Sequence, residues 1–404
     1  MFGAKFFHLL SYGAADQHTV RELRGAYDGL LVPGTVAAFQ REGTGGFVLT
    51  LSASEARTPY VIDPRSPLFQ QVIDEPKKSH VSLRGILGLP ADADYVKDPA
   101  KFGQPLVEEV ANNWAQFNCH YQAKAGAKFE KYAKRLGTPD LKLETASAPE
   151  LVLAPYFVAN ELYDPWWDLS SRLHAATRAA VARLAPGKPC VRVVATEDAG
   201  ALSSLLSSLE EAHLFVWVSD LNEAKASVGE LTAYGRAIRD ATARGQSLVA
   251  LYGGFFAVLL ATVGLRGVSH GIGYGEHRNW IELPQSGPPP ARYYLPEAHC
   301  YVRPELADVL WGAQVTRCDC PVCKAAPPIL LEYHDLMMHS VHCRAQEIRA
   351  WQGLSSQEAA ARLVAEHKDF ASRLKEAEIK QPFKEEAARH AEHVPRWIAV
   401  LREI

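Results

Sequence analysis

Three cysteines within six residues form the densest group of reactive side chains in this sequence. Cys318, Cys320 and Cys323 stand in the segment CDCPVC, in a chain that has seven cysteines among 404 residues. Thiolates at the spacing C-x-C-x-x-C can hold one tetrahedral ion, which then needs a fourth ligand from elsewhere. The odd total of cysteines, several of them scattered singly, favours reduced thiols and a metal site over a disulfide framework.

The helix-like segment that follows supplies candidates for the fourth ligand. It reads LLEYHDLMMHSVHCRAQEIRAW and offers His334, His339, His342 and Cys343. Three thiolates and one imidazole close the tetrahedron and leave no position for a reactive water, so the expected role of the site is structural. Zn²⁺ is the ion that we expect, although ligand type alone also suits iron.

Polar side chains follow several short apolar runs, at the points where these runs end. Asp63 follows PYVI, Asn160 and Glu161 follow PYFVA, and Asp220 follows FVWVS. Singly, such an acid is as typical of a helix N-cap as of a reactive site. Asp63 precedes a proline that restricts its backbone, and a carboxylate held in this way could exchange a proton with a bound base.

Two later segments add ring-binding and charged groups. In GIGYGEHR, Tyr274 could stack on a ring, Glu276 could act as acid, base or nucleophile, and Arg278 could hold a phosphate. Gly253 and Gly254 directly follow the run SLVALY, where they would let a flat ligand approach the backbone or simply form a tight turn.

Apolar runs alternate with helix-like stretches, such as 168–184 and 221–244, which is typical of a parallel sheet covered on both faces. About eight strands over roughly 250 residues match the size of a (β/α)₈ TIM barrel. The expected strands are Gly29–Ala37, Phe47–Leu51, Pro59–Asp63, Leu151–Ala159, Cys190–Ala195, His213–Ser219, Ser247–Tyr252 and Gly267–Tyr274.

The predicted organisation is a barrel over 1–300, with a helical insertion at about 72–150, and a zinc-binding helical subdomain over 301–404. A net charge of −3 excludes a protein that binds polyanions over its whole surface. No run of about 18 uncharged apolar residues predicts a membrane span. We therefore expect a cytoplasmic protein with no membrane partner.

The cysteine motif followed by a helix with a fourth ligand, on a chain with a barrel pattern, resembles the tRNA-guanine transglycosylases. That family has a CxCxxC, a helical stretch and a histidine in a context like S-x-H-N. Here the segment from Ser340 to Cys343, SVHC, matches that context. The resemblance implies that His342 is the fourth ligand, while the short gap from Cys323 keeps His339 as the alternative.

The resemblance also implies roles for residues at the strand ends. IDPRSPLFQ looks like the family's TDSGGFQ, so Asp63 matches its base-pocket acid, and Phe69 and Gln70 follow in step. The family's MAFDE matches VANE, so Asn160 replaces an Asp and Glu161 is retained. These residues would contact the base.

The segment GVSHGIGYGEHR matches the family's nucleophile strand, with Arg278 in step with its Arg and Ile272 at the position of its nucleophile. The resemblance therefore leaves Asp220, or otherwise Glu276, to attack the sugar. This divergence is most similar to the DNA-modifying branch of the superfamily, the DpdA-type transglycosylases. The resemblance to this branch implies that the protein exchanges guanine in DNA for a free 7-deazaguanine base.

Two alternatives to a DNA-modifying enzyme remain open. One is a transglycosylase that acts on tRNA, and the other is a non-catalytic homologue that binds nucleic acid or nucleobases. Many members of the family dimerise, so the resemblance is compatible with a homodimer or with partner proteins.

Overall fold

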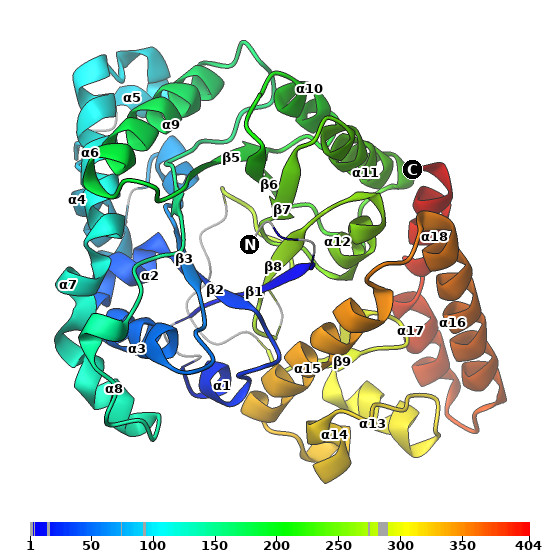
Figure 1. Ribbon diagram of the computed structural model, residues 1–404. Coiled ribbons are helices and arrows are strands. Elements are labelled where there is room, and N and C mark those ends of the chain that lie inside the picture. The colour runs from blue at the N-terminus through cyan, green and yellow to red at the C-terminus, as the bar shows by residue number, and fades with distance from the viewer. Residues whose placement is uncertain are drawn as a thin grey trace. The chain divides into compact units, whose positions relative to one another are not determined.

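The computed structural model describes residues 3, 5–13, 17–73, 75–91, 94–273, 275–281 and 290–404. Tyr274, one of the predicted binding residues, lies outside the described residues, as does most of the Pro-rich loop at 285–292. Eight strands form one sheet in the order β3-β2-β1-β8-β7-β6-β5-β4 (Figure 1). This order is that of a (β/α)₈ barrel and confirms the predicted fold class.

The strands pair in parallel within the series β1–β2–β3, β4–β5–β6 and β7–β8. Between β3 and β4 the backbone N–H of Glu150 donates to Tyr60 O at 2.8 Å, so the sheet is nearly closed there. The strands are β1 (Phe7–Ser11), β2 (Gly29–Pro33), β3 (Tyr60–Asp63), β4 (Val152–Leu153), β5 (Cys190–Thr196), β6 (His213–Val218), β7 (Ser247–Ala250) and β8 (Gly267–Gly271).

One predicted strand, Phe47–Leu51, is wrong, because these residues lie within helix α3 (Arg41–Ala53). Every residue from Thr44 to Ser52 is buried. A continuous apolar run carries no periodicity that separates a buried helix from a buried strand. The eighth strand of the barrel is instead β1, an N-terminal strand that the sequence pattern did not predict.

The segment between β3 and β4 is helical, as predicted for the insertion. Trp114 in α6 donates its indole N–H to Leu153 O at 2.7 Å, which attaches the insertion to β4. The insertion contains α4 (Lys78–Leu87), α5 (Asp94–Lys97), α6 (Gln104–Cys119), α7 (Tyr121–Ala125) and α8 (Phe129–Arg135). The other barrel helices are α1 (Gln17–Glu22), α2 (Gly34–Phe39), α9 (Pro165–Leu184), α10 (Ala201–Ser207), α11 (Val228–Ala243) and α12 (Phe255–Leu259).

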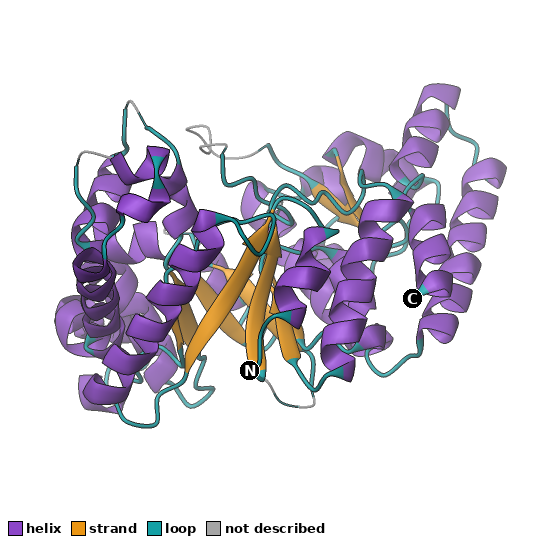
Figure 2. Cartoon of the chain, turned by 90° about the horizontal axis from the view of Figure 1, so that it is seen from above, coloured by secondary structure: helices purple, strands orange, loops and turns teal. Residues whose placement is uncertain are grey.

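The C-terminal region begins with an antiparallel pair of short strands and is otherwise helical, as predicted (Figure 2). It has its own buried core, in which the cysteines of the CDCPVC segment pack with Tyr293, Leu310, Leu336 and Phe370. Its elements are β9 (Tyr293–Leu295), β10 (Cys300–Val302), α13 (Pro304–Gly312), α14 (Pro321–Ala325), α15 (Tyr333–Trp351), α16 (Ser356–Glu376), α17 (Gln381–His390) and α18 (Val394–Glu403).

The chain forms two compact units. One comprises residues 1–8, 220–278 and 284–404, and the other comprises 9–219 and 279–283. The predicted boundary at residue 300 follows the sequence pattern and stays a prediction. Within the described part of the chain, no helix combines the length and the apolar character that crossing a bilayer requires.

Candidate functional site

The three cysteines of CDCPVC converge on one histidine of α15. Cys318 Sγ, Cys320 Sγ and Cys323 Sγ lie 3.7, 3.4 and 3.3 Å from His339 Nδ1. All four residues are buried and form a group that could hold a metal ion. Cys320 is the N-cap of α14 and its sulfur accepts the backbone N–H of Cys323 at 3.4 Å, so the local turn itself brings two of the thiols together.

The spacing of these atoms fits a zinc ion. With Zn–S bonds of about 2.3 Å and Zn–N bonds of about 2.0–2.1 Å, a tetrahedron has S–N edges of about 3.5 Å. His339 Nε2 lies 2.7 Å from Tyr294 O, so the Nε2–H donates to this carbonyl and Nδ1 keeps its lone pair for an ion. Tyr293 stacks on the same imidazole, with ring centroids 4.1 Å apart. The group is a closed, buried set of donors, which is typical of structural zinc.

The structure corrects the prediction that His342 is the fourth ligand. His339, the alternative, lies in the group with the cysteines, whereas His342 does not. His339 is fully buried on the side of α15 that faces Tyr294, while His342 is only half-buried. The packing of α15 therefore decides which histidine faces the cysteines, and the match of residues 340–343 to the family's S-x-H-N sequence does not.

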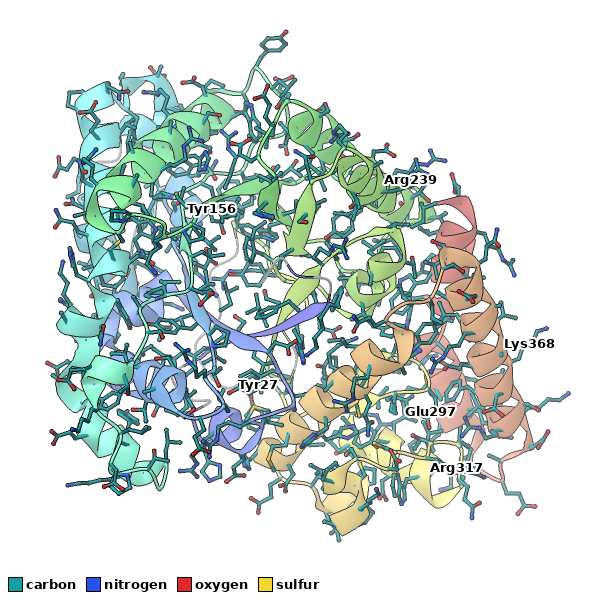
Figure 3. All side chains as sticks on the ribbon, in the orientation of Figure 1. Tyr27, Tyr156, Arg239, Glu297, Arg317 and Lys368 are labelled. Carbon is teal, nitrogen blue, oxygen red and sulfur yellow. The ribbon has the colours of Figure 1, made fainter. Side chains whose placement is uncertain are left out.

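Asp63 ends β3 with its side chain fully buried. Its carboxylate accepts the Tyr156 hydroxyl at 3.0 Å and the Arg65 backbone N–H at 3.0 Å, and Arg65 Nε lies 3.6 Å away. Figure 3 labels Tyr156, which lies in the loop after β4. Asp63 is thus a held carboxylate at a strand end, as its sequence context predicts, but it has no surface open to solvent.

The two residues that follow Asp63 in the family motif have structural partners. Gln70 donates its amide N–H to Val158 O at 3.0 Å and accepts the Val158 N–H at 2.6 Å. Phe69 is 1% exposed and packs beneath the Arg84 guanidinium, 5.6 Å from the ring centroid. Both residues hold the loop after β3 in place.

Asn160 and Glu161 are exposed after the β4 region. Asn160 Oδ1 accepts the Thr196 hydroxyl at 2.8 Å and the Glu197 N–H at 2.9 Å. Glu197 in turn accepts the Trp280 indole N–H at 2.8 Å. Glu197, directly after β5, was not predicted, although its place at a strand end is the same signal that selected the other acids.

Asp220 lies two residues after Val218, the last residue of β6, and is exposed. Its φ of 57° lies in the left-handed region, and its backbone N–H donates to Arg278 O at 2.8 Å. Arg278 lies over the Tyr252 ring, 5.6 Å from its centroid. Among the residues that the structure describes, none forms a hydrogen bond or ion pair with the Asp220 carboxylate, so this acid is open to a ligand.

Gly253 and Gly254 leave room for protein atoms. A Cβ on Gly253 would lie 2.6 Å from Ala257 Cβ, and one on Gly254 would lie 2.8 Å from carboxylate oxygens of both Glu223 and Glu276. The turn after β7 therefore needs glycine because two acids pack against it.

Glu223 is the main functional-site candidate that the sequence analysis missed. Its carboxylate accepts the N–H groups of Gly254 at 2.9 Å, Phe256 at 2.8 Å and Ala257 at 3.2 Å, and so caps α12. Burial, with the nearby charge of Glu276, raises the pKa of Glu223 to about 7. The only sequence signal is an acid three residues after Asp220.

We expect Glu223 to make stability depend on pH. Between pH 4.5 and about 7 the folded protein binds a proton that Glu223 has released in the unfolded chain, so the free energy of unfolding falls as pH rises through this range. Urea unfolding at pH 5, 6, 7 and 8 measures this slope. Glu223→Gln should flatten it while lowering stability at pH 5, because an amide cannot accept all three N–H groups. An unchanged slope in the variant would assign the pH dependence to other groups.

Arg344 joins α15, the helix that carries His339, to the loop after β8. It is buried in α15, forms an ion pair with Glu276, and lies 2.9 Å from Glu347. Its guanidinium also lies over the rings of Phe255, at 5.7 Å, and Tyr294, at 5.1 Å. Burial raises the pKa of Glu276, and Arg344 opposes that rise. Arg344 therefore neutralises the charge of the Glu276 carboxylate and fixes its position. A carboxylate paired in this way is a weaker nucleophile than one without an ion-pair partner.

Arg344→Met should destabilise the protein by about 3–5 kcal/mol, because it removes the cation that pairs with Glu276 and, among the described residues, leaves Glu347 with only His299 as an ion-pair partner. Arg349→Met is the matched control, since Arg349 lies exposed on the same helix. Chemical denaturation of both variants and of the unaltered protein gives the comparison. Equal losses in the two variants would contradict a special role for the buried pair.

No family model and no curated protein matches this chain. Among solved structures it is similar to a nitroalkane oxidase from Streptomyces ansochromogenes, at 11% identity over 98% of each chain and a TM-score of 0.28. That likeness is too low to carry an argument about fold or activity.

Proposed function

We propose that this protein is a base-exchange transglycosylase that replaces guanine in DNA by a 7-deazaguanine derivative such as 7-cyano-7-deazaguanine. The observation that carries the proposal is the buried Cys₃His group in the helical region of a (β/α)₈ barrel chain. The transglycosylases that the sequence resembles combine these two features. Zn²⁺ held by Cys318, Cys320, Cys323 and His339 would stabilise the fold and take no part in the reaction.

Asp220 is the proposed nucleophile. It is exposed two residues after the end of a barrel strand and has no partner for its carboxylate among the described residues, whereas Glu276 is paired with Arg344. The position that the family motif assigns to the nucleophile holds Ile272, a buried apolar side chain that cannot attack. Active sites of barrel enzymes lie at the carboxyl ends of the strands, which is where Asp220 stands.

The reaction proceeds in two displacements at the sugar. An Asp220 carboxylate oxygen bonds to C1′, the C1′–N9 bond of guanine breaks, and guanine leaves with that electron pair and takes up a proton. The 7-deazaguanine then loses its N9 proton and attacks C1′, which releases the carboxylate. The target nucleotide must leave the base stack for this chemistry, which an enzyme achieves by flipping it out.

The remaining predicted residues receive supporting roles. Because Asp63 has no exposed surface, we assign it to holding Tyr156 and the loop of Gln70 rather than to direct proton transfer. Asn160 and Glu161 are exposed and could bind base edges.

Incubation of the protein with radiolabelled 7-cyano-7-deazaguanine or guanine tests the proposal, with duplex DNA, single-stranded DNA and tRNA as acceptors. We expect label in DNA and release of an equal amount of unlabelled guanine. Label in tRNA alone would replace DNA by tRNA as the substrate. Label in no polymer would overturn the enzymatic proposal, and a filter-binding measurement would then test the protein as a reader of nucleic acid.

A further inference from the structure

A fifth side chain of a type that can bind a metal, Cys343, lies beside the Cys₃His group. Its sulfur is 3.5 Å from His339 Nδ1 and 3.7 Å from Cys318 Sγ. Cys343 is 1% exposed and belongs to the same buried core as the other three thiols. Four sulfurs and one imidazole nitrogen therefore surround a centre at which zinc takes four ligands.

The distances from Cys343 Sγ to Cys318 Sγ and to His339 Nδ1 are those expected between two ligands of one zinc ion. Zn–S bonds of about 2.3 Å give tetrahedral S–S edges of about 3.8 Å, close to the separation of Cys343 from Cys318. The set of donors that all lie within 4.8 Å of one another nevertheless contains His339 and not Cys343. Cys343 thus lies beside the edge between His339 and Cys318, and it needs a small movement to reach the ion.

The helix explains why either residue can supply the fourth ligand. His339 and Cys343 are four residues apart on α15, so they lie on one face, one turn above the other. Cys343 also lines a cavity of about 310 Å³ with Glu297, Arg317 and Glu347, so its surroundings leave space for adjustment. Figure 3 shows Glu297 and Arg317 close together in this region.

We propose that Cys343 is a reserve ligand, which takes the fourth position when His339 leaves the ion and so converts a Cys₃His site into a Cys₄ site. In this exchange His339 Nδ1 would give up its place as a ligand and accept the proton of the Cys343 thiol, and the resulting Cys343 thiolate would take that place. The total charge of the group is unchanged, because the new thiolate is balanced by the imidazolium. Softer ions favour the four-thiolate form, since thiolate is the softer ligand.

This inference does not depend on the proposed reaction, and the number of metal–sulfur bonds tests it. Co²⁺ replaces zinc in the full-length protein, and its near-ultraviolet charge-transfer absorption grows with each cobalt–thiolate bond. His339→Ala should keep one bound cobalt and gain about one third in this absorption, as three thiolates become four. Cys343→Ser should leave the absorption unchanged, because Cys343 is not a ligand while His339 is present.

The double variant His339→Ala/Cys343→Ser separates replacement by Cys343 from replacement by water. We expect it to bind cobalt at least about 10-fold more weakly than His339→Ala. Equal absorption and equal affinity in His339→Ala and the double variant would overturn the proposal. If His339→Ala does not fold, X-ray absorption of the unaltered protein decides. We expect three sulfurs and one nitrogen around zinc but four sulfurs around cadmium, and three sulfurs around both ions would overturn the proposal.

Discussion

Asp220→Asn is expected to lower the rate of base exchange by at least about 10³-fold, because an amide cannot form the glycosyl ester that the carboxylate forms. The side chain keeps its size, and the Asp220 backbone N–H keeps its bond to Arg278 O. Fold and nucleic-acid binding should therefore remain. The measurements are release of guanine from DNA and incorporation of labelled 7-cyano-7-deazaguanine, each in a single turnover.

Asp140→Asn is the matched control, since it makes the same change at an exposed acid of the insertion. It should leave both rates within about twofold, because surface substitutions of this kind have small effects. Full activity of Asp220→Asn would remove Asp220 from the mechanism. Loss of activity in Glu276→Gln, with the free energy of unfolding unchanged, would then assign the attack to Glu276.

A covalent intermediate provides a second observation on the same step. A protein–DNA adduct that survives denaturation should form with the unaltered protein when guanine can leave and no incoming base is present. The adduct should be absent in Asp220→Asn. An adduct that forms equally in both proteins would place the bond on another side chain.

Removal of the metal has the second large effect that we expect. Cys320→Ser, or treatment with a chelator, should lower the free energy of unfolding by about 4 kcal/mol or more, because an ion held by this group would bind the folded state and link the segments of the C-terminal core. Cys320 is fully buried and lies in that core with Tyr293, Leu336 and Phe370. Thermal unfolding with and without zinc measures the loss.

Cys119→Ser is the matched control for this prediction. Cys119 is a free, partly exposed cysteine at the end of α6 and is not in the metal group. Its variant should respond to the chelator as the unaltered protein does. A melting temperature of the unaltered protein that does not change on chelation would contradict a structural role for the ion.

The order of strands and helices was largely predictable from the sequence, and one apolar run was not. Short apolar runs followed by amphipathic stretches are a local signal, and most of them are barrel strands. Phe47–Leu51 has the same apolar composition but is helical, and residues 44–52 of α3 are all buried, so this part of the helix has no exposed polar face. Burial on all sides removes the periodicity on which such predictions depend.

By itself, the sequence determined the three thiols of the candidate metal site. Cys318, Cys320 and Cys323 are two and three residues apart, so the local chain brings their sulfurs together. Only the tertiary structure decided the rest of the centre. Packing sets the face of α15 that meets the thiols, and so it selects His339 over His342. It also pairs Arg344 with Glu276, 68 residues away, in a contact that no local spacing encodes.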